Sequence, residues 1–207
     1  MRKYWVIGKE NLRHNMSFTL IAVAVMMLVS PHVLGMKNLD AMQSAKVLEM
    51  YAALAGIILF PPLFLPEQNQ DLRELVMSKY TSQAIVCIVR LVQAMAVLVV
   101  VILFFIGMMK SGGSVFPAGK DFLGTLAGAA ALGGLGILMY GLSDNPVIGY
   151  MAPLIYYLIN YGAGEKYLKN FYLFSMMKGS YTEKIYLGVA AVLMTAAGIY
   201  WRTVRRR

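Results

Sequence analysis

The feature that most constrains this chain is a series of strongly apolar runs, several of them about 18 residues or longer without a formal charge. A helix of that length crosses a hydrocarbon layer about 30 Å thick. The composition agrees, because 59% of the 207 residues are hydrophobic and 14% are charged, against about 45–50% and about 25% in soluble domains. We therefore predict an all-α integral membrane protein, with residues 1–207 forming a single transmembrane domain.

The apolar runs divide into six predicted spans, with Pro31 expected to kink or shorten the first one and the Pro61-Pro62 pair to break the second. The third span is the longest, and Arg90, about six residues inside it, could snorkel to the interface or face a protein interior. The apolar patch before the last span is too short to cross, which predicts a re-entrant or interfacial element. The predicted spans cover residues 18–36, 48–65, 84–109, 122–142, 146–162 and 185–201.

The basic residues predict the orientation. The formal net charge is +9, but the basic residues gather at the ends of apolar runs rather than along a stripe with aromatics, which argues against a nucleic-acid partner. With six spans, eleven of the 19 Lys and Arg residues fall on the side of the two termini and eight on the other. All arginines fall at or near the first side, so the positive-inside rule predicts a multi-pass cell-membrane protein with cytosolic termini. These arginines are Arg2, Arg13, Arg73, Arg90, Arg202, Arg205, Arg206 and Arg207.

The interval Pro66–Gln83 between the second and third spans is polar and carries charges of both signs. As a helix it would place Leu72, Leu75 and Val76 on one narrow apolar face, with charges mostly around the other side. One interpretation is an amphipathic helix that binds a soluble partner, and the other is a solvated loop. The polar candidates for contact are Glu67, Asp71, Arg73, Glu74 and Lys79.

Two further segments predict contacts with lipid and between helices. The basic N-terminal segment, with Tyr4, Trp5, Lys9 and Arg13, is predicted to lie in the membrane interface. In the fourth span, small residues recur four apart, which permits close helix packing, although an excess of glycine is common in membrane helices. The glycines in question are Gly124, Gly128, Gly133 and Gly134.

The sequence lacks the motifs of the common catalytic sites. It has no phosphate-binding GxxxxGK[ST] loop, no HExxH and no GxSxG. Its single cysteine, Cys87, excludes an intrachain disulfide, and neither histidine has the spacing of a metal site. We expect Glu49, Asp121 and Asp144 to lie at span ends where water reaches them, which leaves no carboxylate in mid-span for ion coupling. The chain is therefore predicted to be neither an enzyme nor a metalloprotein.

The chain resembles the permease subunits of ABC-2 type ABC transporters. The resemblance rests on six spans, a basic N-terminal segment, the segment PEQNQDLRELVMSKYTSQAIVCIVRLV, the segment LSDNPVIGYMAPLIYYLINY and the apolar patch before the last span. It implies an ATP-driven exporter in which the polar interval is a coupling helix. Leu72, Leu75 and Val76 would then anchor it in a separate ATP-binding cassette subunit.

The same resemblance implies a second permease chain, in a homodimer or a heterodimer, and contact with membrane lipid. No cofactor is expected on this chain, since ATP and Mg would bind to the partner subunit. The sequence leaves open another interpretation, a non-transporting membrane scaffold or accessory subunit of a membrane complex.

Overall fold

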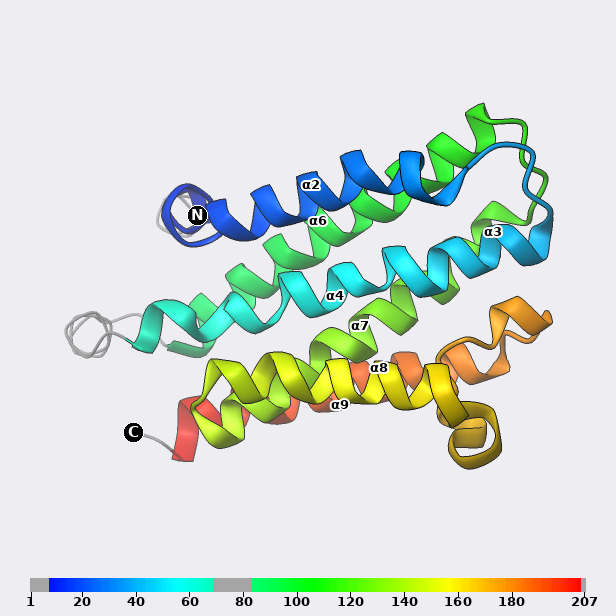
Figure 1. Cartoon of the computed structure of the whole chain (residues 1–207). Helices are drawn as coiled ribbons and strands as arrows, with labels where there is room; N and C mark the ends of the chain where they lie inside the picture. The colour runs from blue at the N-terminus through cyan, green and yellow to red at the C-terminus, as the bar shows by residue number, and fades with distance from the viewer. Residues whose placement is uncertain (1–7, 69–82, 206–207) are drawn as a thin grey trace.

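The computed structural model describes residues 8–68 and 83–205, and every regular element in these two ranges is helical (Figure 1). Within these ranges, five helices are long and apolar enough to cross a membrane, which indicates a membrane protein. They are Ser17–Leu34, Ala41–Pro66, Gln83–Ser111, Ala118–Ser143 and Thr182–Val204.

Helix α8 (Pro146–Leu168) has 23 residues and packs beside α7 (Ala118–Ser143). It is not among the five, so the described residues contain five membrane-length apolar helices where the sequence predicted six spans. The polar residues of its C-terminal half, among them Asn160 and Lys166, lower its apolar character.

The second membrane-length helix begins earlier than predicted, because α3 (Ala41–Val47) continues through η2 (Leu48–Ala52) into α4 (Leu54–Leu59). A capping box starts it: Gln43 N donates to Asp40 Oδ1 at 2.7 Å, and Asp40 N donates to Gln43 Oε1 at 3.3 Å. The helix therefore begins seven residues before residue 48, where the second span was predicted to start. At Pro61 the chain tightens into the 3₁₀ helix η3 (Pro61–Gln68).

Part of the buried core lies where α4 crosses α7. A Cβ on Gly56 would come within 2.0 Å of the carbonyl oxygen of Ala129, so the two backbones touch there. The large side chains of Leu48, Phe60 and Phe64 are fully buried beside this crossing. Helix α2 (Ser17–Leu34), in contrast, lies at the edge and buries only Thr19, Val23 and Ser30.

The long helices lie along a common axis, so the bundle has two ends (Figure 1). One end, here called the terminal end, carries both described chain ends together with Gln68 and Gln83, which flank the range 69–82. The other, the distal end, carries the connections near Lys37, near Ser114 and between α8 and α9 (Thr182–Tyr200).

The connection between α8 and α9 folds back against the bundle. It forms two short 3₁₀ turns, η4 (Lys169–Phe171) and η5 (Met176–Lys178), and η5 contacts α3. Its residues 173–176 are buried. The apolar patch predicted to be re-entrant or interfacial is thus packed against other helices at the distal end.

Candidate functional site

Two buried arginines hold η3 at the terminal end. Arg90 on α6 (Gln83–Ser111) is 8% exposed, and its Nη1 donates to the carbonyl oxygen of Leu63 at 2.9 Å. Arg90 was predicted either to snorkel to the interface or to face the protein interior, and in the structure it faces the interior. A guanidinium has several donors, so one of them can serve a backbone carbonyl oxygen inside η3.

The second arginine, Arg202, reaches η3 from the last helix. Its guanidinium carbon lies 4.8 Å from the ring centroid of Phe64 and 5.4 Å from that of Tyr140, distances typical of cation–π contacts. The two rings pack edge to face at 5.5 Å. The guanidinium also donates to Asp144, which ends α7 in a left-handed conformation with φ of 56°.

We call Leu63, Phe64, Arg90 and Arg202 the η3 clamp. Through it, the segment that leads into the polar interval is bound to α6 by a hydrogen bond and to the last helix by a cation–π contact. Both arginine side chains are nearly inaccessible to water, so these contacts are screened less than surface ion pairs. A displacement of η3 therefore acts on both helices.

The N-terminal segment is attached to α6 one turn beyond Arg90. Gln93 Nε2 donates to the carbonyl oxygen of Gly8 at 2.8 Å, and Asn11 Nδ2 donates to Gln93 Oε1 at 2.8 Å. Lys9 and Arg13, two of the residues predicted to lie in the interface, are exposed. The other two, Tyr4 and Trp5, lie outside the described residues.

Most of the predicted coupling residues also lie outside the described residues: Asp71, Leu72, Arg73, Glu74, Leu75, Val76 and Lys79. Glu67 is described only as part of the backbone of η3. What the structure does describe is the pair of flanks, Gln68 and Gln83, at the same end as the chain ends (Figure 1).

The four glycines proposed for packing all lie buried on α7. A Cβ on Gly133 would come within 1.5 Å of the Phe60 ring, and one on Gly134 within 2.9 Å of the carbonyl oxygen of Ala191. Gly124 faces Met176 and Gly128 faces Leu173, both in the connection between α8 and α9. The glycines of α7 thus let three neighbours approach closely: the Phe60 ring, α9, and the connection between α8 and α9.

At the distal end the structure holds an ion pair that the sequence did not predict. Glu49 and Lys184 lie 2.6 Å apart, with side chains 1% and 5% exposed. The carboxylate also accepts hydrogen bonds from the backbone N–H groups of Met176 at 2.9 Å and Met177 at 3.0 Å. The Lys184 ammonium donates in addition to the carbonyl oxygen of Leu173.

Beside this pair lies a second buried carboxylate, Asp121, with no exposed surface. Its Oδ1 accepts a hydrogen bond from the Tyr181 hydroxyl at 2.6 Å, and its Oδ2 has no hydrogen-bond partner among the described residues. Burial, and next the hydrogen bond to Asp121, raise the pKa of Tyr181 well above its ordinary value. The hydroxyl therefore stays protonated and keeps donating to the carboxylate.

The expectation that Glu49 and Asp121 lie at water-accessible span ends was therefore wrong, while Asp144 is 33% exposed beside Arg202. Glu49 lies two turns inside a helix that begins at Ala41 instead of Leu48. Asp121 does lie at a span end, in the first turn of α7, but it is covered there and its Oδ1 is bonded to the Tyr181 hydroxyl. The sequence signal for Glu49 was the capping pair Asp40 and Gln43, which places it two turns inside a helix.

Within residues 8–68 and 83–205, no three His, Cys, Asp or Glu side chains come close enough together to hold a metal ion. The Cys87 thiol is buried. Comparisons with protein families, with curated proteins and with solved structures give no significant match.

Proposed function

We propose that the chain is the membrane-spanning permease subunit of an ATP-driven ABC exporter, coupled to a separate ATP-binding subunit through the polar interval Pro66–Gln83. The proposal combines the resemblance of the sequence with the arrangement of the helices at the terminal end. The arginine distribution supports a cytosolic location of that end, where an ATPase could reach the interval.

The observation that carries the proposal is the η3 clamp. A coupling segment transmits force only if it is fixed to the helices that have to move. Here η3 leads directly into the interval and is held by Arg90 of α6 and Arg202 beyond the end of α9. Closure of the ATPase pair would push on the interval, and the clamp would pass the displacement to two membrane-length helices as rigid bodies.

In this mechanism the chain itself performs no chemistry. ATP and Mg bind to the partner subunit, and Leu72, Leu75 and Val76 anchor the interval in a groove of that partner. Asp71, Arg73, Glu74 and Lys79 make polar contacts around the anchor, as does Glu67 near the end of η3. A second permease chain completes the translocation path.

The test is to purify the tagged chain from its native membranes in a mild detergent, to identify co-purifying proteins by mass spectrometry and to measure vanadate-sensitive ATP hydrolysis. We expect a protein with a nucleotide-binding motif to co-purify. Leu75→Asp and Glu74→Arg should lose it together with the ATPase activity while membrane insertion is unchanged. Lys37→Glu, an exposed charge reversal at the distal end, is the control and should retain both.

Full retention of the ATPase and its activity in the Leu75→Asp and Glu74→Arg variants would contradict the coupling role of the interval. Absence of any nucleotide-binding partner from the purified wild-type protein would contradict the exporter itself and favour the accessory or scaffold subunit.

A further inference from the structure

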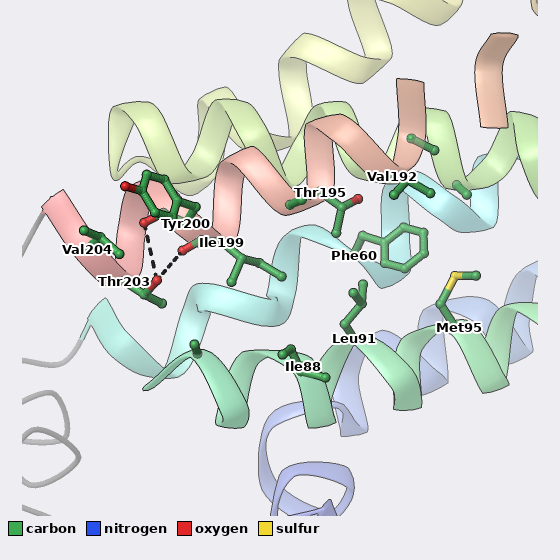
Figure 2. A pocket seen from close by; sticks show the side chains of 14 residues that line it. Phe60, Ile88, Leu91, Met95, Val192, Thr195, Ile199, Tyr200, Thr203 and Val204 are labelled. Atoms are coloured by element: carbon green, nitrogen blue, oxygen red, sulfur yellow. Dashed lines mark hydrogen bonds between the residues drawn. The ribbon is translucent and has the colours of Figure 1, made fainter. Parts of the chain in front are cut away.

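One cavity beside the last helix has a lining that selects no particular ligand. It opens between α6 and the last helix, and Ile88, Leu91 and Val192 are among the apolar side chains that line it (Figure 2). The hydroxyl of Thr203, one of its few polar groups, donates to the carbonyl oxygen of Ile199 in its own helix (Figure 2).

A smaller cavity at the distal end has a different lining. It measures about 350 Å³ and lies between the first turns of α7 and of α9. Its walls include Lys120 and Gly124 of α7, and Tyr181 and Lys184 at the start of α9. Lys120 is exposed, so this cavity, here called the distal pocket, has a charged rim that stays in contact with water.

Tyr181 connects the distal pocket to a buried acid. The residue lines the pocket, and its hydroxyl donates to Asp121 Oδ1 at 2.6 Å. Asp121 is not part of the lining and has no exposed surface. Its second oxygen, Oδ2, has no hydrogen-bond partner among the described residues. The acid is therefore separated from the pocket by one side chain.

The buried charges of this region do not balance. Lys184 is buried, but it is already paired with Glu49 at 2.6 Å. Burial raises the pKa of the Tyr181 hydroxyl, which is neutral at pH 7. Within residues 8–68 and 83–205, no basic side chain forms an ion pair with Asp121. The other charged side chains described at this end of α6, α7, α8, η4, η5 and α9 are exposed or partly exposed: Lys110, Lys120, Lys166, Lys169, Lys178 and Glu183.

An unpaired negative charge on Asp121 has to be neutralised. Taking a lone carboxylate out of water is strongly unfavourable, and a buried acid commonly takes up a proton instead. A metal ion such as Mg²⁺ needs about six ligands, and nowhere in the described part of the chain do three acidic, His or Cys side chains converge. A proton needs only one oxygen.

We propose that Asp121 is a proton-binding site that exchanges its proton with the distal pocket through Tyr181. The Tyr181 hydroxyl passes its own proton to Oδ1 and takes another from a hydronium ion in the pocket, which becomes water. The phenol is unchanged and the carboxylate becomes a carboxylic acid, so the uncompensated charge disappears. The site opens to the distal side of the bundle, and it does not depend on the proposed transport function.

The experiment is infrared spectroscopy of the full-length protein in nanodiscs at pH 7, where an aspartate in water is ionised. Samples with and without ¹³C at the side-chain carboxyl carbon of aspartate are compared. We expect the carbonyl stretching band of one buried carboxylic acid, shifted by the label. Asp121→Asn should remove this band. The control is Asp40→Asn, at an exposed position where asparagine also caps a helix, and it should keep the band.

Transfer into deuterium oxide tests the route of the proton. The acid band shifts when deuterium replaces the proton, and Tyr181→Phe should slow this shift at least fivefold because the relay is lost. Tyr186→Phe changes an exposed tyrosine of α9 outside the distal pocket. This control should exchange at the rate of the wild type.

Circular dichroism and gel filtration identify variants that remain folded, and the isotope label requires no variant. The inference is overturned if no acid band exists at pH 7, or if the band persists in folded Asp121→Asn. It is also overturned if the aspartate label does not shift the band, which would assign the proton to a glutamate such as Glu49, or if folded Tyr181→Phe exchanges at the wild-type rate. A band that appears only after choline replaces sodium overturns it as well, because Asp121 would then bind sodium ions.

Discussion

Glu49 and Lys184 form a buried ion pair, 2.6 Å between oxygen and nitrogen, that joins the second and the last of the membrane-length helices. Two backbone N–H groups of the connection between α8 and α9 donate to the same carboxylate. The Glu49 carboxylate thus joins two helices and a loop. Both side chains of the pair are buried, so water cannot replace a lost partner.

The first prediction concerns this pair. Removing one partner of a buried pair leaves an uncompensated charge, so Lys184→Met should lower the free energy of unfolding by about 3–5 kcal/mol. The double variant Glu49→Gln with Lys184→Met should recover part of the loss, since no lone charge remains. Chemical denaturation in detergent measures both. The control is Lys46→Met, on the exposed side of α3, which should change the free energy of unfolding by less than about 0.5 kcal/mol. Equal stability of Lys184→Met and wild type would contradict the role of the pair.

The second prediction concerns pH and Tyr181, whose pKa in the folded protein is raised above its ordinary value of 10.0. A raised folded pKa means that its stabilising contribution is fully present below about pH 10 and is lost as the pH rises through the folded value. The stability difference between wild type and Tyr181→Phe should therefore be constant at neutral and mildly alkaline pH and should shrink above pH 10. Alkaline denaturation of the two proteins followed by circular dichroism measures it. A difference that already shrinks between pH 6 and 9 would assign the effect to another group.

The third prediction concerns the glycines of α7. In Gly133→Ala the new methyl group would overlap the buried ring of Phe60, and such overpacking costs about 1–3 kcal/mol. Gly119, in the first turn of the same helix, has open space at the Cβ position. Gly119→Ala should be neutral or up to about 1 kcal/mol stabilising through helix propensity. Thermal unfolding in detergent compares the two, and a stability of Gly133→Ala at or above that of Gly119→Ala would be inconsistent with the packing described.

The fourth prediction concerns the η3 clamp. Arg202→Leu removes the ion pair with Asp144 and the contacts with two aromatic rings, which should cost about 1–3 kcal/mol. Because η3 would then be held from one side only, proteolysis at the terminal end should accelerate more than the loss of global stability explains. Limited proteolysis with mapped cleavage sites measures this. The control is Arg13→Leu, which changes an exposed arginine. Identical cleavage patterns for Arg202→Leu and wild type would contradict the role of the η3 clamp.

The apolar runs predicted the helices well where hydrophobicity alone decides them. The third span was expected over residues 84–109, and α6 covers Gln83–Ser111. The apolar runs miss the start of a helix where polar residues begin it: the second span was expected from residue 48, whereas the capping box of Asp40 and Gln43 starts the helix at Ala41. The fifth segment shows the reverse: a helix forms there, but its composition does not match that of the five apolar ones.

The site could be predicted only in part. Arg90 was recognised as unusual because it lies inside an apolar run, but its partner, the carbonyl oxygen of Leu63, is a backbone atom that no side-chain pattern reveals. Lys184 stood close to a predicted span end, and nothing in its neighbourhood along the chain points to Glu49. Such contacts depend on how the helices cross, and local sequence does not encode the crossing.

The Glu49–Lys184 pair also has a consequence for biogenesis. Chains are synthesised and begin to fold from the N-terminus, so the helix that carries Glu49 meets the membrane before Lys184 has left the ribosome. A lone carboxylate is costly in hydrocarbon, and this one obtains its counter-charge only when the last membrane-length helix arrives. The pair is therefore completed only when the C-terminal helix is in place, and a chain that ends before residue 184 would keep Glu49 without this counter-charge.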